Sequence, residues 1–425
     1  MRSLVLVALS LCASLLLASC AVLEGVGDAH PRGQVPLGGA CDCPSPEAWS
    51  GCSDGFLSRN VSVCENGSCA LREEFRPCPY DELTYPEGVP PGMAGAVDPA
   101  SFLPDGLLAA DSPLVTPVAV GASVDSRTAA YVQGIIDAAG DDGSILLLLR
   151  QYTSPVYFAS PDSPRQRVML SCGPAWQLGV QALEGVPLPE GAAPSEDDPG
   201  GPDPVGCGEA SVKDNHMVIL DLDAGCEYDF WQMRKVDGSW VASWGNALPL
   251  GGSGIYPTGL STRGSGIAFS SGLIWPAELA RGRIAHALVF SYPFTRSSGP
   301  VPPATESDGE SKADFALPEG AHVQLDPALD LDTLNLTPAE RTIARALQEY
   351  GMYLVDNAGE YGVSLYAVDP KSFEGDPYDG MFPAEDYPAL SRIPLASFRV
   401  LALPEQDASW RRNVRLQGNR CTRFA

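Results

Sequence analysis

The chain has 425 residues, and its 53 Asp and Glu against 27 Lys and Arg give a formal net charge of -26 at pH 7. A surface with this acidic excess repels phosphate backbones, so the composition argues against nucleic acid as a partner.

The first nineteen residues predict an export signal. Arg2 supplies a positive charge, and the apolar run that follows is too short for a stable membrane span. The run ends in Leu17-Ala18-Ser19-Cys20, which resembles a bacterial lipoprotein signal and makes Cys20 the expected lipidation site. In such proteins Ala21 after the cysteine favours the outer membrane. The alternative is an ordinary secretory signal that leaves Cys20 a free thiol. No later stretch is long and apolar enough to predict a transmembrane span.

The cysteines predict disulfide bonds. Removing Cys12 and Cys20 from the twelve leaves an even number in an exported chain, which favours disulfides over metal thiolates. Six of them crowd into one short segment: Cys41, Cys43, Cys52, Cys64, Cys69 and Cys78. We expect Cys172 to pair with Cys207 across a polar loop.

Composition divides the mature chain into five parts. Residues 20–40 predict a flexible tether, residues 41–80 a cysteine-rich disulfide module, and residues 81–112 a Pro/Gly linker. Within the module, an Asn66-Gly67 turn between alternating residues predicts a β-hairpin. Residues 113–405 form the main β-rich domain. Residues 406–425 form a basic C-terminal tail, which we expect to dock on the acidic domain through a disulfide of Cys421.

Short strands dominate the main domain. The pattern predicts strands at 144–150, 152–159, 214–220, 226–231, 284–290 and 352–355, and a helix at 126–139. A second helix is predicted from the N-cap Thr337 to Gly351, because Glu340 completes a capping box. Few helices among many strands predict a mainly β fold, an antiparallel β-sandwich or barrel-like domain with a few inserted helices, preceded by a small disulfide-rich module.

Strand periodicity brings polar side chains together in the middle of the chain. A period of two places Asp214 and His216 on one face of their strand. In the next strand, Glu227, Asp229 and Trp231 share a face, and Tyr228 lies on the other. His286 falls on an otherwise apolar face, which is more typical of a buried structural histidine than of a catalytic one.

We expect a polar site if these strands are neighbours. His216, Glu227, Glu278 and His286 are the candidate catalytic residues, and Asp214, Tyr228 and Trp231 are candidate binding residues. Carboxylates suit glycoside hydrolysis, whereas histidine with tyrosine suits β-elimination from uronic acids. Histidine and carboxylate ligands also suit zinc or calcium, but no diagnostic metal spacing is present, so cofactors stay unassigned.

Several short motifs together resemble an uncharacterised family of exported bacterial proteins. They are Asp214-x-His216, Gly225-Cys226-Glu227-Tyr228-Asp229-Phe230-Trp231, Gly282-x-Ile284-x-His286-Ala287-Leu288 and Ala346-Leu347-Gln348-Glu349-Tyr350-Gly351-Met352. The resemblance covers roughly residues 144–403. It implies an exported domain without a known reaction, and we extend it to a carbohydrate-related role.

These features predict a surface lipoprotein whose β-rich domain binds a polysaccharide and cleaves it as a glycoside hydrolase or lyase. The alternative is a non-catalytic cell-envelope or protein-interaction lipoprotein. An enzyme requires His216, Glu227, Glu278 and His286 to converge in an open cleft. A structural role for the histidines places them buried and apart.

Overall fold

The computed structural model describes residues 44–45, 48, 56–65, 68–77, 97–140, 143–208, 213–358, 362–413 and 415–425. The predicted signal, Cys20, the tether and most of the cysteine-rich module lie outside these residues. The chain divides into two compact units: Met1–Pro46 with Asn60–Arg72, and Glu47–Arg59 with Glu73–Ala425.

The predicted hairpin is present. Strand β1 (Phe56–Glu65) pairs with β2 (Ser68–Pro77) in a two-stranded sheet, and the predicted Asn66-Gly67 turn lies outside the described residues. Cys69, on β2, is disulfide-bonded, in keeping with the disulfides expected for this module.

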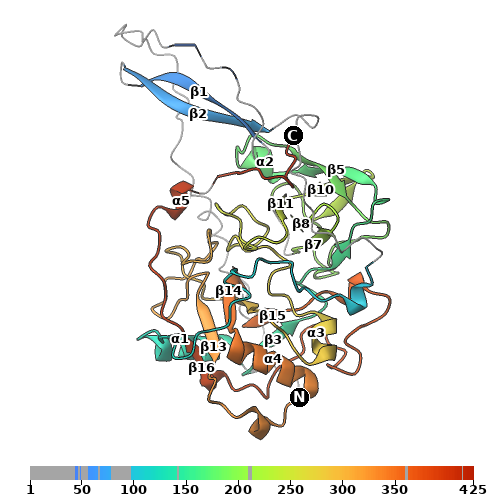
Figure 1. The fold of residues 1–425 in the computed structure, drawn as a ribbon, viewed down its shortest axis with the longest axis vertical. Helices are drawn as coiled ribbons and strands as arrows, with labels where there is room; N and C mark the ends of the chain where they lie inside the picture. The colour runs from blue at the N-terminus through green and yellow to red at the C-terminus, as the bar shows by residue number, and fades with distance from the viewer. Residues whose placement is uncertain are drawn as a thin grey trace, which may run out of the picture. The chain divides into compact units, whose positions relative to one another are not determined.

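Three sheets build the larger unit (Figure 1). The first has the order β6-β5-β10-β9 and the second β11-β8-β7-β4. Their strands are β4 (Val156–Phe158), β5 (Arg165–Leu170), β6 (Ala182–Pro187), β7 (Met217–Asp221), β8 (Cys226–Trp231), β9 (Arg234–Val236), β10 (Ser239–Ala242) and β11 (Trp244–Pro249).

The third sheet has six strands in the order β16-β13-β14-β12-β15-β3. They are β3 (Leu146–Leu148), β12 (Leu288–Tyr292), β13 (His322–Leu325), β14 (Met352–Asn357), β15 (Ser364–Tyr366) and β16 (Phe398–Val400). The mainly β class is confirmed. Parallel pairs such as β12 with β14 occur beside antiparallel ones, so the sheets are mixed.

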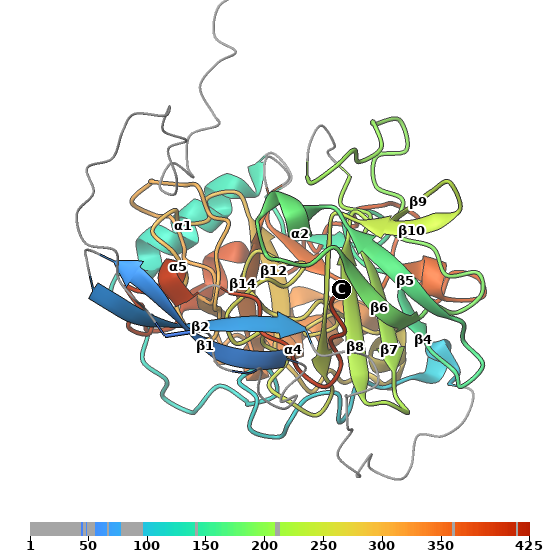
Figure 2. The same cartoon turned by 90° about the horizontal axis from the view of Figure 1, so that it is seen from above.

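The sheets pack in layers, because β7 is buried on both faces. Met217 and Ile219 belong to a core shared with the β6-β5-β10-β9 sheet, whereas Val218 and Leu220 face the six-stranded sheet. Figure 2 shows β7 and β8 beside β5 and β6. Successive side chains of β7 thus point to opposite sides, as expected for a strand, and the β11-β8-β7-β4 sheet lies between the other two sheets.

Helices cover the outer face of the six-stranded sheet. They are α1 (Thr128–Ala138) and α4 (Pro338–Glu349), whose apolar residues share a core with β12 and β14. Both helices were predicted, and Thr337 and Glu340 form the expected capping box. The shorter helices are α2 (Cys172–Ala175), α3 (Pro276–Arg281) and α5 (Trp410–Asn413).

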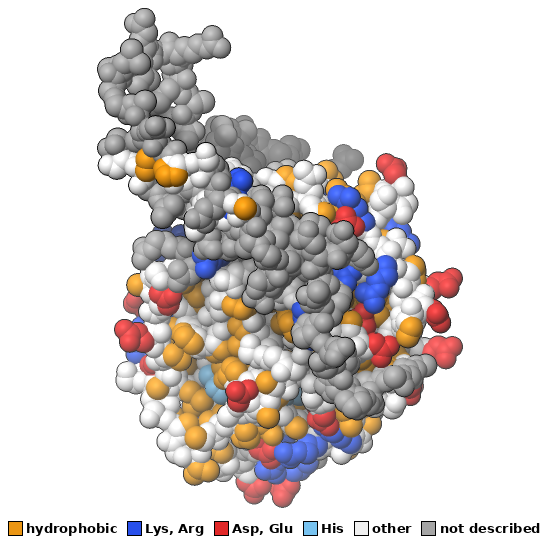
Figure 3. Space-filling view, turned by 45° about the horizontal axis from the view of Figure 1, so that its top comes forward, with side chains coloured by type: hydrophobic (Ala, Val, Ile, Leu, Met, Phe, Trp, Pro, Cys, Tyr) orange, Lys and Arg blue, Asp and Glu red, His pale blue; other side chains and the backbone are white. Residues whose placement is uncertain are grey.

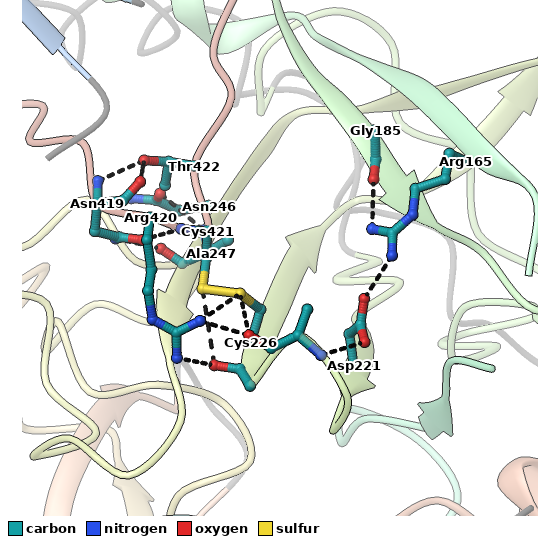
Figure 4. The surroundings of a disulfide bond; sticks show 12 residues. Arg165, Gly185, Asp221, Cys226, Asn246, Ala247, Asn419, Arg420, Cys421 and Thr422 are labelled. Atoms are coloured by element: carbon teal, nitrogen blue, oxygen red, sulfur yellow. Dashed lines mark hydrogen bonds and ion pairs between the residues drawn. A yellow bond between two sulfur atoms is a disulfide. The ribbon is translucent and has the colours of Figure 1, made fainter. Parts of the chain in front are cut away.

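Two predicted features of the C-terminal tail and the loops are confirmed. Cys172 pairs with Cys207, and Cys226 on β8 pairs with Cys421 (Figure 4). Beside this second disulfide, Arg420 donates to the carbonyls of Ala224 and Gly225. The tail is thus fixed by a covalent bond and by hydrogen bonds to backbone carbonyls.

Part of the predicted linker belongs to the folded unit, which corrects one domain boundary. Phe102 packs with ring centroids 4.6 Å from Phe158 and 5.0 Å from Trp275, and Leu107 is buried. The proline and glycine content of 81–112 concealed these apolar anchors. Within the described residues 97–112, Phe102 and Leu107 therefore anchor the segment on the folded unit.

The face in Figure 3 carries acidic and basic side chains among hydrophobic and uncharged ones, as is usual for a surface in water. Within the described part of the chain, no helix combines the length and the apolar character that crossing a bilayer requires.

Candidate functional site

A cavity of about 440 Å³ lies where one end of the β11-β8-β7-β4 sheet meets the six-stranded sheet, and we call it the central cavity. Residues at the start of β7, the end of β8 and the start of β11 line one side: Asp214, His216, Trp231 and Trp244. The end of β14 and the start of β15 line the other, with Asp356, Asn357, Ser364 and Tyr366. Segments 260–264 and 306–308 also line it. The volume is typical of a small-ligand site.

Aromatic side chains form much of this wall. Trp176 is 42% exposed, and its ring lies 5.5 Å from the buried ring of Trp244. The Cys172–Cys207 disulfide holds α2, which ends at Trp176, to the loop that carries Gly208. A Cβ at Gly208 would lie 3.0 Å from the Trp231 ring, so this loop packs directly against a second wall residue. The disulfide therefore supports two of the three indoles.

Four carboxyl groups also line the cavity: Asp214, Glu306, Asp308 and Asp356. Trp231 donates its indole N–H to Asp214 at 3.0 Å. Leu260 donates its backbone N–H to Glu306 at 2.6 Å. Asp356 accepts from the Tyr366 hydroxyl at 3.4 Å. Each contact uses part of a carboxyl group's accepting capacity, which leaves oxygen lone pairs for a ligand.

Desolvation shifts these carboxyl groups towards the protonated form. Burial, followed by the charge of Asp197, raises the pKa of Asp214 to about 7. Burial raises the pKa of Glu306 to about 7 as well, and that of Asp308, the most exposed of the four, to about 6. The pKa of Asp356 is raised well above its usual value by burial and by Asp308. Protonated and ionised carboxyl groups therefore coexist here near neutral pH.

Asp197 fixes the backbone that presents Asp214. It is fully buried and accepts from the backbone N–H groups of Tyr152, Asp214 and Asn215 at 2.6–3.0 Å. Asn215 has a positive φ of 41°, a conformation that asparagine tolerates better than most residues. These bonds hold Asp214 and His216 on the cavity side of the chain as it enters β7.

His216 is neutral at physiological pH. Burial and the nearby charge of Arg263 lower its pKa to about 3. Its Nδ1 lies 3.2 Å from the Phe230 carbonyl, which only accepts, so Nδ1 carries the proton and Nε2 keeps its lone pair. His216 therefore offers the cavity a hydrogen-bond acceptor or a weak base.

Arg263 supplies a buried positive charge in the cavity wall. Its guanidinium lies 4.1 Å from the Phe269 ring centroid and 5.0 Å from that of Tyr366, and Nη1 donates to the Ala268 and Ser271 carbonyls. Its Nε and Nη2 atoms have no hydrogen-bond partner among the described residues, nor does the hydroxyl of the buried wall residue Ser364. Such unsatisfied groups are costly unless a ligand or solvent reaches them.

The predicted site residues fall into separate places. Asp214, His216 and Trp231 line the cavity, as the prediction of one polar centre required. Glu227 does not line the cavity. It is paired with Leu220 on the neighbouring strand β7, and it accepts hydrogen bonds from the backbone N–H and the hydroxyl of Ser270. Leu220 lies four residues along the chain from His216, which is about 13 Å in a strand, so its partner Glu227 lies far from His216. Tyr228, a predicted binding residue, is buried in the core on the other face of β8.

Glu278 and His286 form a pair of their own, outside the cavity wall. Glu278 is fully buried and lies 3.1 Å from Nε2 of His286, whose Nδ1 is 2.9 Å from the Ala287 carbonyl. Burial lowers the pKa of His286, but the carboxylate of Glu278 outweighs it and the net pKa is raised. The expected convergence of the four candidate catalytic side chains is therefore wrong, and the pairing is that of a structural histidine.

The strand expected at 284–290 is shorter than predicted, which explains this pair. Helix α3 ends at Gly282, whose positive φ of 74° reverses the chain, and β12 begins only at Leu288. His286 thus folds back onto Glu278 instead of lying in the sheet.

The remaining cavity residues were not identified from the sequence. Glu306 and Asp308 lie on a loop outside the predicted strands and helices, and Trp176 is not among the predicted binding residues. Asp356 and Asn357 follow directly after the strand predicted at 352–355, and an acidic residue at a strand end is the one signal in the sequence that points to them.

Comparisons of the chain with protein-family models, curated proteins and solved structures find no match. No group of three or more His, Cys, Asp or Glu residues in the described part of the chain is placed to hold a metal ion.

Proposed function

We propose that this domain binds a saccharide chain in the central cavity and hydrolyses it with two of the cavity's carboxyl groups. The observation that carries the proposal is the combination, in one cavity of about 440 Å³, of indole surfaces with carboxyl groups of raised pKa. The apolar faces of sugar rings stack on aromatic side chains, and carboxyl groups bind their hydroxyls.

The roles follow from the protonation states. Asp214, with a pKa of about 7, is largely protonated in mildly acidic to neutral solution and acts as the general acid that protonates the leaving glycosidic oxygen. Asp308, with a pKa of about 6, is largely ionised at neutral pH. It either activates a water molecule or attacks the anomeric carbon. Asp197 acts as a positioning residue for Asp214.

The lyase alternative is less favourable. A uronic acid brings a carboxylate into a wall that already holds four carboxyl groups, and like charges at close range repel. Hydrolysis of an uncharged or cationic glycan avoids this cost.

We also propose that the protein is exported and anchored at the cell envelope through lipid on Cys20, most simply in the outer membrane. The Leu17-Ala18-Ser19-Cys20 pattern supports this, as do two disulfides in the described part of the chain, since such bonds form in oxidising compartments. Metabolic labelling with a fatty acid tests it, because Cys20→Ser should abolish incorporation. Labelling that survives this change would contradict the anchor.

The catalytic proposal is tested with a panel of bacterial and plant polysaccharides, measuring both binding and release of new reducing ends. Asp214→Asn and Asp308→Asn should lower release by about 100-fold or more while binding persists. The matched control is Asp162→Asn, which removes one exposed carboxylate outside the cavity. Binding without release would contradict the hydrolytic half of the proposal, and no binding at all would contradict the whole.

A further inference from the structure

We infer that the saccharide bound in the central cavity carries a protonated amine, as glycans with free amino sugars do. The inference rests on the proposed function and names its substrate class. It depends on the balance of charge in the cavity wall and on a buried hydroxyl group of the wall that has no hydrogen-bond partner among the described residues.

The wall holds more acid than base. Asp214, Glu306, Asp308 and Asp356 line it, and within the described residues none of them forms an ion pair with Lys or Arg. Arg263 is the cation of this wall, and His216 is neutral. One guanidinium therefore faces four carboxyl groups.

The carboxyl groups raise one another's pKa in addition to the effect of burial. The charge of Asp308 raises the pKa of Asp214, of Glu306 and of Asp356 in this way, and Asp197 adds to the effect at Asp214. A cation bound among them would allow several to ionise at a smaller cost. An ammonium group bound among Glu306, Asp308 and Asp356 would therefore offset part of the free-energy cost of keeping these acids together.

Two further observations support the inference, one of them pointing to a polar ligand and the other to an ammonium group. Ser364 is 1% exposed and lies in the cavity wall, yet its hydroxyl has no partner among the described residues. The indoles of Trp176 and Trp231 lie in the same wall, and the faces of indole rings attract ammonium groups. Carboxylates beside aromatic faces are the usual surroundings of a bound ammonium ion.

The test is isothermal titration of the mature protein with three oligosaccharides of the same linkage and length. One is built of glucosamine, one of N-acetylglucosamine and one of glucose, so that acetylation removes the charge and glucose removes the nitrogen. We expect the glucosamine oligomer to bind about tenfold or more tightly than either neutral oligomer, because charge-assisted hydrogen bonds are about twice as strong as neutral ones.

Glu306→Gln keeps the shape of a wall carboxyl and removes its charge, and it should reduce this preference severalfold. Asp162→Asn, outside the wall, should leave it unchanged. Equal affinity for all three oligomers overturns the inference and leaves saccharide binding standing. A preference that Glu306→Gln does not alter also overturns it, since the amine would then bind elsewhere. If none of the three binds, the proposed function fails together with the inference.

Discussion

Asp214→Asn is predicted to stabilise the protein at alkaline pH. The pKa of Asp214 is raised from 3.8 to about 7 by burial first and by Asp197 second. Below pH 3.8 the carboxyl group is protonated in the folded and unfolded chains alike, so it has no effect. Between pH 3.8 and about 7 only the unfolded chain ionises, and the folded protein loses stability as pH rises.

The magnitude follows from these two pKa values. The difference between about 7 and 3.8, at 1.36 kcal/mol per pH unit, gives a ceiling of about 4 kcal/mol at pH 8. Asp214 is only half-buried by surface area, because it faces the cavity, so water there reduces the cost to about 2–3 kcal/mol. Asparagine retains an acceptor for the Trp231 indole and carries no charge, so the substitution removes this cost.

The assay is urea unfolding of wild type and Asp214→Asn at pH 4 and pH 8, with Asp162→Asn as the control. The account predicts a difference below about 1 kcal/mol at pH 4, where the unfolded chain is only partly ionised, and a variant more stable by about 2–3 kcal/mol at pH 8, with no change in the control. A variant that is no more stable than wild type at pH 8 would refute the assignment of a raised pKa to Asp214.

Three further predictions concern the scaffold. Cys421→Ser breaks the disulfide to β8, which spans 195 residues, and should cost about 2–5 kcal/mol of unfolding free energy, a loss that reducing agent reproduces in wild type. Glu278→Gln leaves His286 without its carboxylate and should cost about 3–5 kcal/mol at pH 5. Because the pKa of His286 is raised in the folded protein, the stabilisation from its protonated form is complete below pH 6.5 and is lost as pH rises through the folded pKa. Urea unfolding at pH 9 should therefore show that Glu278→Gln loses less unfolding free energy than at pH 5. Thr337→Ala removes the N-cap of α4 and should cost about 1 kcal/mol in the same assay.

Each of these has an outcome that contradicts it. A Cys421→Ser protein as stable as wild type would show that the tail docks without its disulfide. A loss in Glu278→Gln that is independent of pH would argue against an ionised His286. A Thr337→Ala protein as stable as wild type would mean that packing of α4 alone fixes its first turn.

Local signals predicted the elements that depend on neighbouring residues. The capping box of α4 needs only Thr337 and Glu340, three positions apart, so it was readable from the sequence. The alternation of side chains between the two faces of β7 was also expected, because the side-chain period of a strand is a local property.

The site was predicted only in part, because its members come from distant segments. Asp214 and Trp231 were found because Asp214 directly precedes β7 and Trp231 ends β8, and two strands joined by a short connection usually pair. Glu306 and Asp308 lie on an irregular loop and reach the cavity only through the packing of two sheets, which no periodicity encodes. His286 was misplaced because a single left-handed glycine, Gly282, ended the preceding helix and shortened the strand.

The most direct test of the central claim is a crystal structure of the mature protein with the oligosaccharide that binds best. The account predicts a sugar ring in the central cavity, stacked on Trp176 or Trp231, with the glycosidic oxygen within hydrogen-bonding distance of Asp214. A sugar bound elsewhere on the surface, with the cavity holding only water, would contradict it.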